Sequence, residues 1–577
     1  MSPKLLTYFS ETLFDRVGHF NPQLLREWQG RLRWRNVILT GLFSLLVQGA
    51  VVFQRLTQLP TGKYSNSRYC LRLVDSNQYC ELGPGKMPLI DWTFVWADVF
   101  RDLSFVLVWT LIVAGVYLLA ADLSKESRRG TINFLRMSPL SRREILVGKL
   151  LGVPILLYLG IGLLLPLHLL TGLGSTYPLT AILGFYSLLG ALTFCFYAAG
   201  LWFALLGTGL QGLQTWLISG LSFGLLTLGL NITHTRSSAD WFHLFNPLQV
   251  LTAWLVKGTD GRTLFPFDQG PGNGLFRSLS WLYLPVGDRV SWFLLFALAN
   301  ALVLGLWFWT VLERKFQMPT NTLLSKRQSY GLTLYLSVII LGFEMQYIPE
   351  KTQLQPTGYI SEYFWGYPIS MMIWSLLLMF LLLPSKQSLL DWTRYRHQTS
   401  RSVADLFHHD GSPSAFAFVT NMAIIGGVLL LGVGAQGLIV GTMHPPSIFW
   451  TWLCCAAALI ICSLVVQWIS LSNFLHWRWL AIGAVAAVIA GWPILLAMGE
   501  IDTYSESHRF LWLTTAFPQA AINEVQILEM CLAIAVQLTI IAGLSWCLNR
   551  RCQVLGQSEW KALLETGKTR LQQETLL

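Results

Sequence analysis

Long apolar runs separated by short polar segments dominate the hydrophobic pattern of this chain. Twelve runs have about the 20-residue length at which a helix crosses a ~30 Å hydrocarbon core. Backbone groups in lipid must form hydrogen bonds within their own segment, so these runs are expected to be helices. A membrane barrel would instead show alternating segments of about ten residues. The predicted spans are 36–54, 95–121, 147–171, 178–206, 213–232, 290–312, 331–347, 365–384, 414–440, 448–472, 478–499 and 523–548.

The order of spans and loops indicates two degenerate halves of six helices each. Each half begins with a span, an outside loop, a second span and then an inside loop that carries basic residues. The fold class expected is therefore an all-α polytopic membrane protein. The predicted parts are a cytoplasmic and interfacial segment 1–35, a first half 36–315 with outside loops 55–94 and 233–289, a second half 316–550 and a cytoplasmic tail 551–577.

Charge supports this membrane assignment and gives an orientation. The chain is 53% hydrophobic and 12% charged, whereas soluble domains have roughly 25% charged residues. Lys and Arg are more than twice as frequent on the N-terminal side of the spans as on the other side, which predicts that both termini are cytoplasmic. The net charge of +10 resides at helix ends, so it does not indicate nucleic-acid binding. We expect a multi-pass protein of the cytoplasmic membrane, without a cleavable signal peptide.

A helix is predicted ahead of the first span. Asn21 is a good N-cap and Pro22 suits the first helical position. Leu24, Leu25 and Trp28 follow at helical spacing among several arginines, a pattern typical of a helix in the headgroup layer. The alternative is an ordinary basic flank of a membrane span.

The loop between the second and third spans, 122–149, combines a short amphipathic segment with residues that end one helix and start the next. Ile132, Phe134, Leu135 and Met137 give it an apolar side. Pro139 ends this helix, because the residue before proline avoids the helical region. Ser141 followed by Glu144 forms a capping box that would start the third span. Such a device can transmit force from a docked partner to a membrane helix, although a basic loop that only fixes topology would have similar composition.

The residues of this loop resemble the cytoplasmic coupling segment of the type-2 ABC exporter permease family. The resemblance implies that the segment docks on a separate ATPase subunit, whose hydrolysis of ATP drives alternating access in the membrane. The matching residues are Glu126, Arg128, Arg129, Gly130, Thr131, Leu135, Ser138, Pro139, Leu140, Ser141, Arg142, Glu144, Gly148 and Lys149.

The chain has no phosphate-binding loop of its own. Such a loop ends in Gly-Lys-Ser/Thr, whereas Lys86 in the sequence 83–86 is followed by Met87. We therefore expect no cofactor, no metal and no enzymatic activity in this chain, with ATP and Mg²⁺ bound by the partner ATPase. The second-half segment 386–397 lacks the Gly-Thr and Ser-Pro-Leu-Ser-Arg elements. It is either a diverged coupling helix or a second interfacial helix, so a second permease chain remains a candidate partner.

Several ionisable or reactive residues lie in or near the spans. Asp98, Arg101 and Asp102 open the second span, where a local Asp98–Arg101 ion pair is the simplest use. His168 in the third span is expected to be a satisfied core histidine, and Glu529 in the last span a helix contact. Cys70 and Cys80 share one outside loop, where an oxidising compartment would permit a disulfide. Roles in a transport pathway are the alternative for the five ionisable residues.

The sequence thus predicts the permease subunit of an ABC exporter, embedded in the lipid bilayer. Two other classes are compatible with many apolar helices. A membrane-embedded enzyme for lipids or glycans would need acid, base or metal groups on one face, and the deep ionisable residues are scattered. An ion-coupled secondary transporter would need a midplane acidic residue, and none is evident. The substrate is not readable from the sequence.

Overall fold

The computed structural model divides the chain into two compact units. The first comprises Met1–Ser280 with Leu284–Gln317, and the second comprises Trp281–Tyr283 with Met318–Leu577. The structure describes residues 15–61, 67–74, 79–84, 86–206, 212–231, 237–252, 256–257, 263–264, 279–345, 366–395, 404–440, 447–472, 476–499, 509–518 and 527–556.

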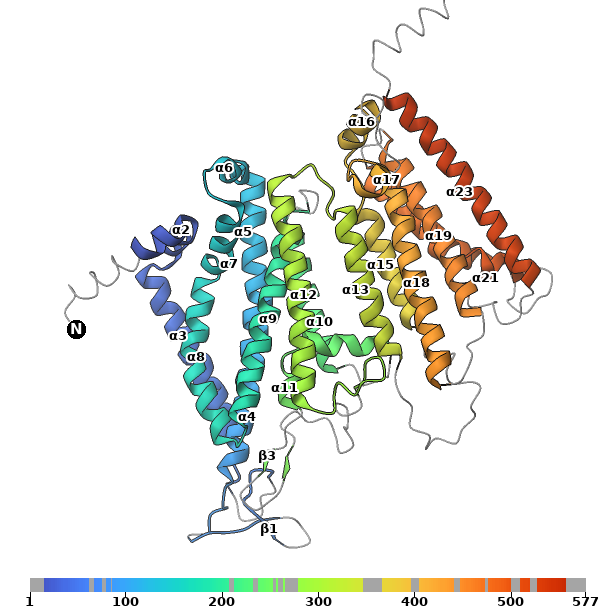
Figure 1. Cartoon of the computed structure of the whole chain (residues 1–577). Coiled ribbons are helices and arrows are strands. Elements are labelled where there is room, and N and C mark those ends of the chain that lie inside the picture. Colours follow the sequence, from blue (N-terminus) through green and yellow to red (C-terminus); the bar gives the residue numbers. More distant parts are fainter. Residues whose placement is uncertain are drawn as a thin grey trace, which may run out of the picture. The chain divides into compact units, whose positions relative to one another are not determined.

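The first unit is a set of long, roughly aligned helices with short helices at one end (Figure 1). In the part of this unit that the structure describes, six helical stretches are long and apolar enough to cross a membrane. Its helices are α2 (Pro22–Arg31), α3 (Trp34–Leu56), α4 (Trp92–Trp109), α5 (Gly115–Arg129), α6 (Thr131–Met137), α7 (Arg142–Gly152), α8 (Ile155–Gly174), α9 (Leu179–Ala204), α10 (Leu213–Asn231), α11 (Gln249–Thr252) and α12 (Val290–Gln317).

The second predicted span is one continuous helical rod, Trp92–Arg129. The rod contains a π-helical turn, η1 (Thr110–Ala114), between α4 and α5. Because of its length the rod extends beyond the apolar region at its C-terminal end, where it leads directly into α6.

In the described parts of the predicted outside loops the elements are short. Two antiparallel pairs form, β1 (Leu73–Val74) with β2 (Tyr79–Cys80) and β3 (Val256–Lys257) with β4 (Thr263–Leu264). A 3₁₀ helix, η3 (Ser238–Phe245), precedes α11.

The second unit is also helical. Its elements are α13 (Lys326–Glu344), α15 (Gly366–Leu381), α16 (Lys386–Tyr395), α17 (Ala404–His408), α18 (Ser414–Val440), α19 (Ser447–Ser470), α20 (Trp477–Ala486), the π-helical turn η4 (Ala487–Gly491), α21 (Trp492–Met498), α22 (Arg509–Leu513) and α23 (Ile527–Gly556).

The all-α polytopic fold is confirmed, although the described residues contain fewer qualifying spans than the twelve predicted. Among the described residues, ten helices are long and apolar enough to cross a membrane. The bent pair of α15 and α16, with an angle of 68°, makes eleven if it is counted as one span. The predicted span 331–347 lies on α13, which does not qualify. Lys326, Arg327 and Glu344 occupy the two ends of this helix, so its apolar part is too short.

The third span starts later than predicted. The capping box of Ser141 and Glu144 forms, but it begins α7, a separate helix that ends at Gly152. The span itself is α8, which begins after Pro154. Proline has no backbone N–H to continue the hydrogen-bond ladder, so it separates the two helices.

Candidate functional site

The short helix α6 stands between two sharp changes of chain direction. It follows α5 directly through Gly130, whose φ of 73° is the left-handed conformation that glycine adopts without strain. It ends at Ser138, whose extended backbone is the conformation that the following Pro139 favours. The predicted amphipathic helix is therefore present, held between the end of the second span and α7 (Figure 1).

The two apolar sides of α6 have different surroundings. Ile132 and Leu135 are 4% and 5% exposed, so they pack inward and anchor the helix. Phe134 and Met137 are 75% and 79% exposed. Leu135, which the family resemblance marked as a coupling residue, therefore supports α6 from inside, whereas the outward apolar surface consists of Phe134 and Met137.

Basic residues of α6 and α7 fasten this region to the end of α12. Arg136 donates from Nε to the carbonyl oxygen of Phe316 at 2.5 Å. Arg143 donates from Nε to the Glu313 carboxylate at 2.8 Å, and Arg142 contacts Gln317. The sixth span of the first unit, α12, is thus connected to α6 and α7, which follow the second span.

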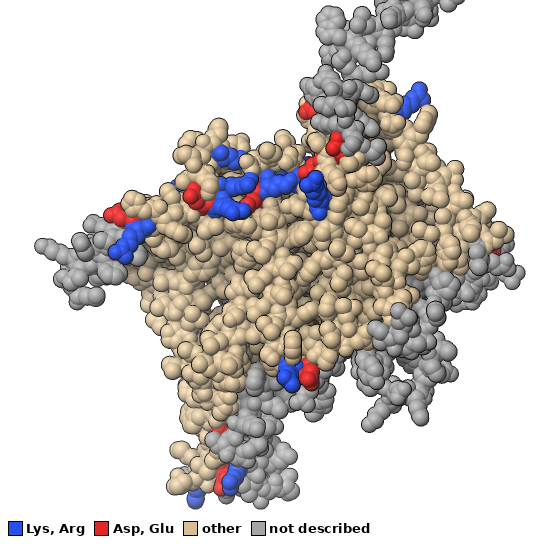
Figure 2. Space-filling model, in the orientation of Figure 1, with Lys and Arg blue, Asp and Glu red and all other residues tan. Residues whose placement is uncertain are grey.

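The remaining residues of the predicted coupling segment lie around α6 and at the start of α7. Figure 2 shows Lys and Arg side chains gathered at this end of the first unit. Among the remaining predicted coupling residues, three are half-buried, namely Glu126, Ser138 and Leu140. The exposed ones are Arg128, Arg129, Gly130, Thr131, Pro139, Ser141, Arg142 and Glu144.

A buried lysine lies at the centre of the same end of the unit. The Lys149 side chain is 0% exposed, and its Nζ lies 2.7 Å from Asp122, 2.8 Å from Glu126 and 3.6 Å from Glu27. Burial alone would lower the pKa of Lys149, but Asp122 and Glu126 more than offset it, so the pKa is raised above its ordinary value. The three carboxylates are close enough together to hold a metal ion, and the Lys149 ammonium already supplies a cation there.

Two further arginines complete this cluster. Arg31 pairs with Asp122 at 2.7 Å and with Glu27 at 3.2 Å, and Arg26 pairs with Glu126 at 3.4 Å. We call the six residues from α2, α5 and α7 the Lys149 cluster: Arg26, Glu27, Arg31, Asp122, Glu126 and Lys149. Sequence reasoning gave no role to Glu27, Arg31 or Asp122, although the i, i+4 spacing of Glu27 and Arg31 is a weak signal of an ion pair.

A second charge cluster lies at the opposite end of the second span. Arg101 lies 3.4 Å from Asp98, as the spacing suggested, and Asp98 is also contacted by Arg68 and by the Tyr69 hydroxyl. Arg55, from the end of α3, pairs with Asp102. These contacts join the first span, the second span and the loop between them.

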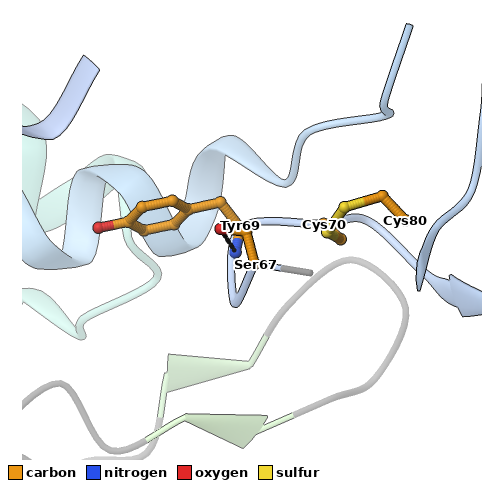
Figure 3. Close-up of a disulfide and its surroundings, with 4 residues drawn as sticks. All are labelled: Ser67, Tyr69, Cys70 and Cys80. Atoms are coloured by element: carbon orange, nitrogen blue, oxygen red, sulfur yellow. Dashed lines mark hydrogen bonds between the residues drawn. A yellow bond between two sulfur atoms is a disulfide. The ribbon is translucent and has the colours of Figure 1, made fainter. Parts of the chain in front are cut away.

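The structure joins Cys70 and Cys80 in a disulfide within that loop. Figure 3 shows the Tyr69 side chain directed away from the disulfide, toward the helix that carries Asp98. The amide of Tyr69 is held by the Ser67 hydroxyl at 3.3 Å. Because Arg68 and Tyr69 precede Cys70 directly, the disulfide restrains the residues that contact Asp98.

The other two singled-out residues lie on the long helices α8 and α23. His168 is buried and fully partnered, with Nε2 at 2.8 Å from the Ser104 hydroxyl and Nδ1 at 2.6 Å from the Tyr186 hydroxyl. Glu529 is half-buried in the first turn of α23.

These features define a polytopic α-helical membrane protein with a short helix that projects an apolar surface beyond its spans. The family model described as "ABC-2 family transporter protein" matches residues 24–312, half of the chain. The chain therefore belongs to the ABC-2 transporter family and is a membrane component of a transporter. The match covers the first unit, which carries α6 and the Lys149 cluster. Comparisons with curated proteins and with solved structures find no match.

Proposed function

We propose that this chain is the permease subunit of an ATP-driven exporter and that a separate ATPase subunit docks on α6. The partner binds ATP and Mg²⁺, and its hydrolysis cycle moves the spans between inside-open and outside-open states. The chain resides in the cytoplasmic membrane with both termini and α6 in the cytoplasm. Membership of the ABC-2 transporter family supports the class of transporter.

One observation carries the docking proposal. Phe134 and Met137 are about three quarters exposed on a helix whose other side is buried. Exposing a large apolar side chain to water is unfavourable in free energy, and burial in a partner's cleft would remove that cost. Arg128 and Arg129, exposed at the end of α5, add positive charge that steers an acidic partner surface.

The contacts of α6 indicate which helices would move if a docked partner displaced α6. The second span continues into α6 through Gly130, and the third span follows through α7. Arg136 and Arg143 connect the same region to α12. Displacement of α6 would therefore move the cytoplasmic ends of three spans together.

The corresponding helix of the second unit is built differently. Leu389 and Trp392 of α16 are 2% and 5% exposed, and they pack in one core cluster with Leu406 and Leu548. An apolar side that is already covered cannot receive a partner. This supports α6, rather than α16, as the ATPase docking helix.

The test is co-purification of this chain with its ABC ATPase partner, for which an ATPase encoded in a neighbouring reading frame would be the first candidate. Phe134→Asp and Met137→Asp place a charge in the proposed contact, and we expect each to reduce the retained ATPase at least roughly tenfold, because burying an unpaired carboxylate is costly. Met87→Asp is the matched control, because Met87 is 74% exposed but precedes the second span.

Undiminished ATPase recovery with both α6 variants, at wild-type melting temperature, would show that α6 is not the docking surface. Native mass spectrometry of the wild-type complex would also give its stoichiometry, and so show whether one or two permease chains accompany the ATPase.

A further inference from the structure

The Lys149 cluster connects α2 to α5 and α7, which lie far from α2 along the chain and are joined to each other through α6. Glu27 and Arg31 come from α2, Asp122 and Glu126 from the end of α5, and Lys149 from α7. The acidic pair of α5 lies within one to two turns of Gly130, where α6 begins. We propose that Lys149 is a positioning residue that carries movement of α6 to α2 and through it to the first span. This inference rests on the proposed function of α6.

The packing of α2 on α7 is close enough to transmit displacement. A Cβ added at Gly148 would lie 2.9 Å from Gln23 Cβ, and one added at Gly152 would lie 2.6 Å from Glu27 Cβ. Two glycines four residues apart thus let the side chains of Gln23 and Glu27 on α2 pack directly against the backbone of α7. Asn21 adds a side-chain hydrogen bond to the carbonyl oxygen of Glu144 at 2.7 Å.

The connection from α2 to the first span is short. α2 ends at Arg31 and α3 begins at Trp34. The Asn36 side chain donates to the carbonyl oxygen of Arg31 at 3.0 Å, across this junction. A shift of α2 therefore displaces the start of α3, and α2 acts as a force-bearing element as well as a membrane-surface helix.

The charges of the cluster explain why Lys149 is needed. Its three carboxylates are matched by Lys149 and two arginines, so the group is neutral as a whole. Only Lys149 is completely buried, and it contacts carboxylates from both α2 and α5. Removing it leaves neighbouring carboxylates poorly compensated in a site that is largely buried, which should separate α2 from α5.

The first test uses the purified full-length chain without its ATPase. Hydrogen exchange is measured for the amides of α2 and for 122–129 in Lys149→Met and in Glu27→Gln, which keeps the shape of the side chain. We expect exchange in α2 to be roughly tenfold faster, with α9 unchanged, because the local opening of α2 becomes easier. Lys125→Met is the matched control, since Lys125 is an exposed lysine on α5 outside the cluster. Unaltered α2 exchange in both cluster variants would overturn the inference.

The second test uses the complex with the ATPase, with and without a non-hydrolysable ATP analogue. In the wild type, the analogue should change exchange at both α6 and α2. In Glu27→Gln, ATPase binding and the α6 response should persist while the α2 response is lost. A wild-type complex that responds at α6 but not at α2 overturns this inference and leaves the proposed function intact. Failure of the ATPase to bind the wild-type chain overturns the proposed function instead.

Discussion

The hydroxyl group of Tyr197 on α9 donates a hydrogen bond to the carbonyl oxygen of Leu111, 2.7 Å away, inside the π-helical turn of the second span. The Ser219 hydroxyl of α10 reaches the neighbouring Val113 carbonyl at 3.0 Å. A π-turn disrupts the regular i to i+4 ladder, so its carbonyls need such outside donors. The turn thus lies in the rod that leads to α6 and is held by two other spans.

Gly115 is required where Tyr197 meets this turn. A Cβ at Gly115 would lie 1.9 Å from the Tyr197 hydroxyl oxygen, and the fully buried ring has little room to move. We expect Gly115→Ala to destabilise the protein by about 1–3 kcal/mol, as overpacking in a core does, measured as a lower melting temperature in detergent. Gly220→Ala is the control, because nothing lies within 4 Å of its added Cβ.

Combining Gly115→Ala with Tyr197→Leu should cost less stability than the sum of the two single variants, since the second change removes the ring that clashes. If the double variant is as unstable as the sum of the two single variants, the close contact is not the cause.

The disulfide between Cys70 and Cys80 should stabilise the loop that contacts Asp98. Replacing both cysteines by serine removes the restraint on the unfolded chain, which typically costs about 2–4 kcal/mol. Arg68 and Tyr69 would then be held less firmly against Asp98. The measurement is the melting temperature with and without reductant. Reductant should lower it in the wild type and leave the double variant unchanged, whereas an equal shift in both would contradict this role.

Local signals that start and end helices made much of the α6 region predictable from the sequence. The positive φ of Gly130, the stop before Pro139 and the capping box of Ser141 each depend on a few neighbouring residues, so the short helix could be placed correctly. Which apolar residues of that helix face outward depends on tertiary packing against other segments. The sequence therefore could not separate Leu135 from Phe134.

The Lys149 cluster was beyond sequence reasoning for a related reason. Its partners Glu27 and Asp122 are far from Lys149 along the chain, so no spacing rule connects them. For the predicted span 331–347, whose described part lies on α13, the reason is simpler. Hydrophobicity suggested 331–347, but polar residues at both ends of α13 limit its apolar length.

The buried side of α16 leads to a prediction that separates two roles for this helix. Trp392 packs with Leu464 and Leu548 in a core cluster of the second unit. Trp392→Ala should therefore lower the melting temperature, with a loss of about 3–5 kcal/mol, while ATPase co-purification stays at the wild-type level per folded chain. Loss of the ATPase without loss of stability would instead make α16 a second docking helix.

Lys326, at the start of α13, should make stability depend on pH. Its side chain is 1% exposed, and its Nζ donates to the carbonyl oxygens of Leu406 at 2.7 Å and Pro413 at 3.0 Å, and to the Ser412 hydroxyl. Burial lowers the pKa of Lys326 from 10.5 to about 8, and the Asp410 carboxylate offsets this only in part. The folded protein therefore releases this proton more readily than the unfolded chain does.

The sign of the effect follows from that difference in proton binding. Between about pH 8 and 10.5 the unfolded chain binds more protons than the folded protein at this residue, so folding stability rises with pH in this window and is flat below it. One pKa unit corresponds to about 1.4 kcal/mol, which limits the rise to ~3 kcal/mol. We expect the melting temperature of the wild type relative to Lys326→Met to increase from about pH 8 to about pH 10. Lys125→Met, which removes an exposed lysine, should follow the wild-type curve, and parallel curves for wild type and Lys326→Met would show that Lys326 does not titrate in this window.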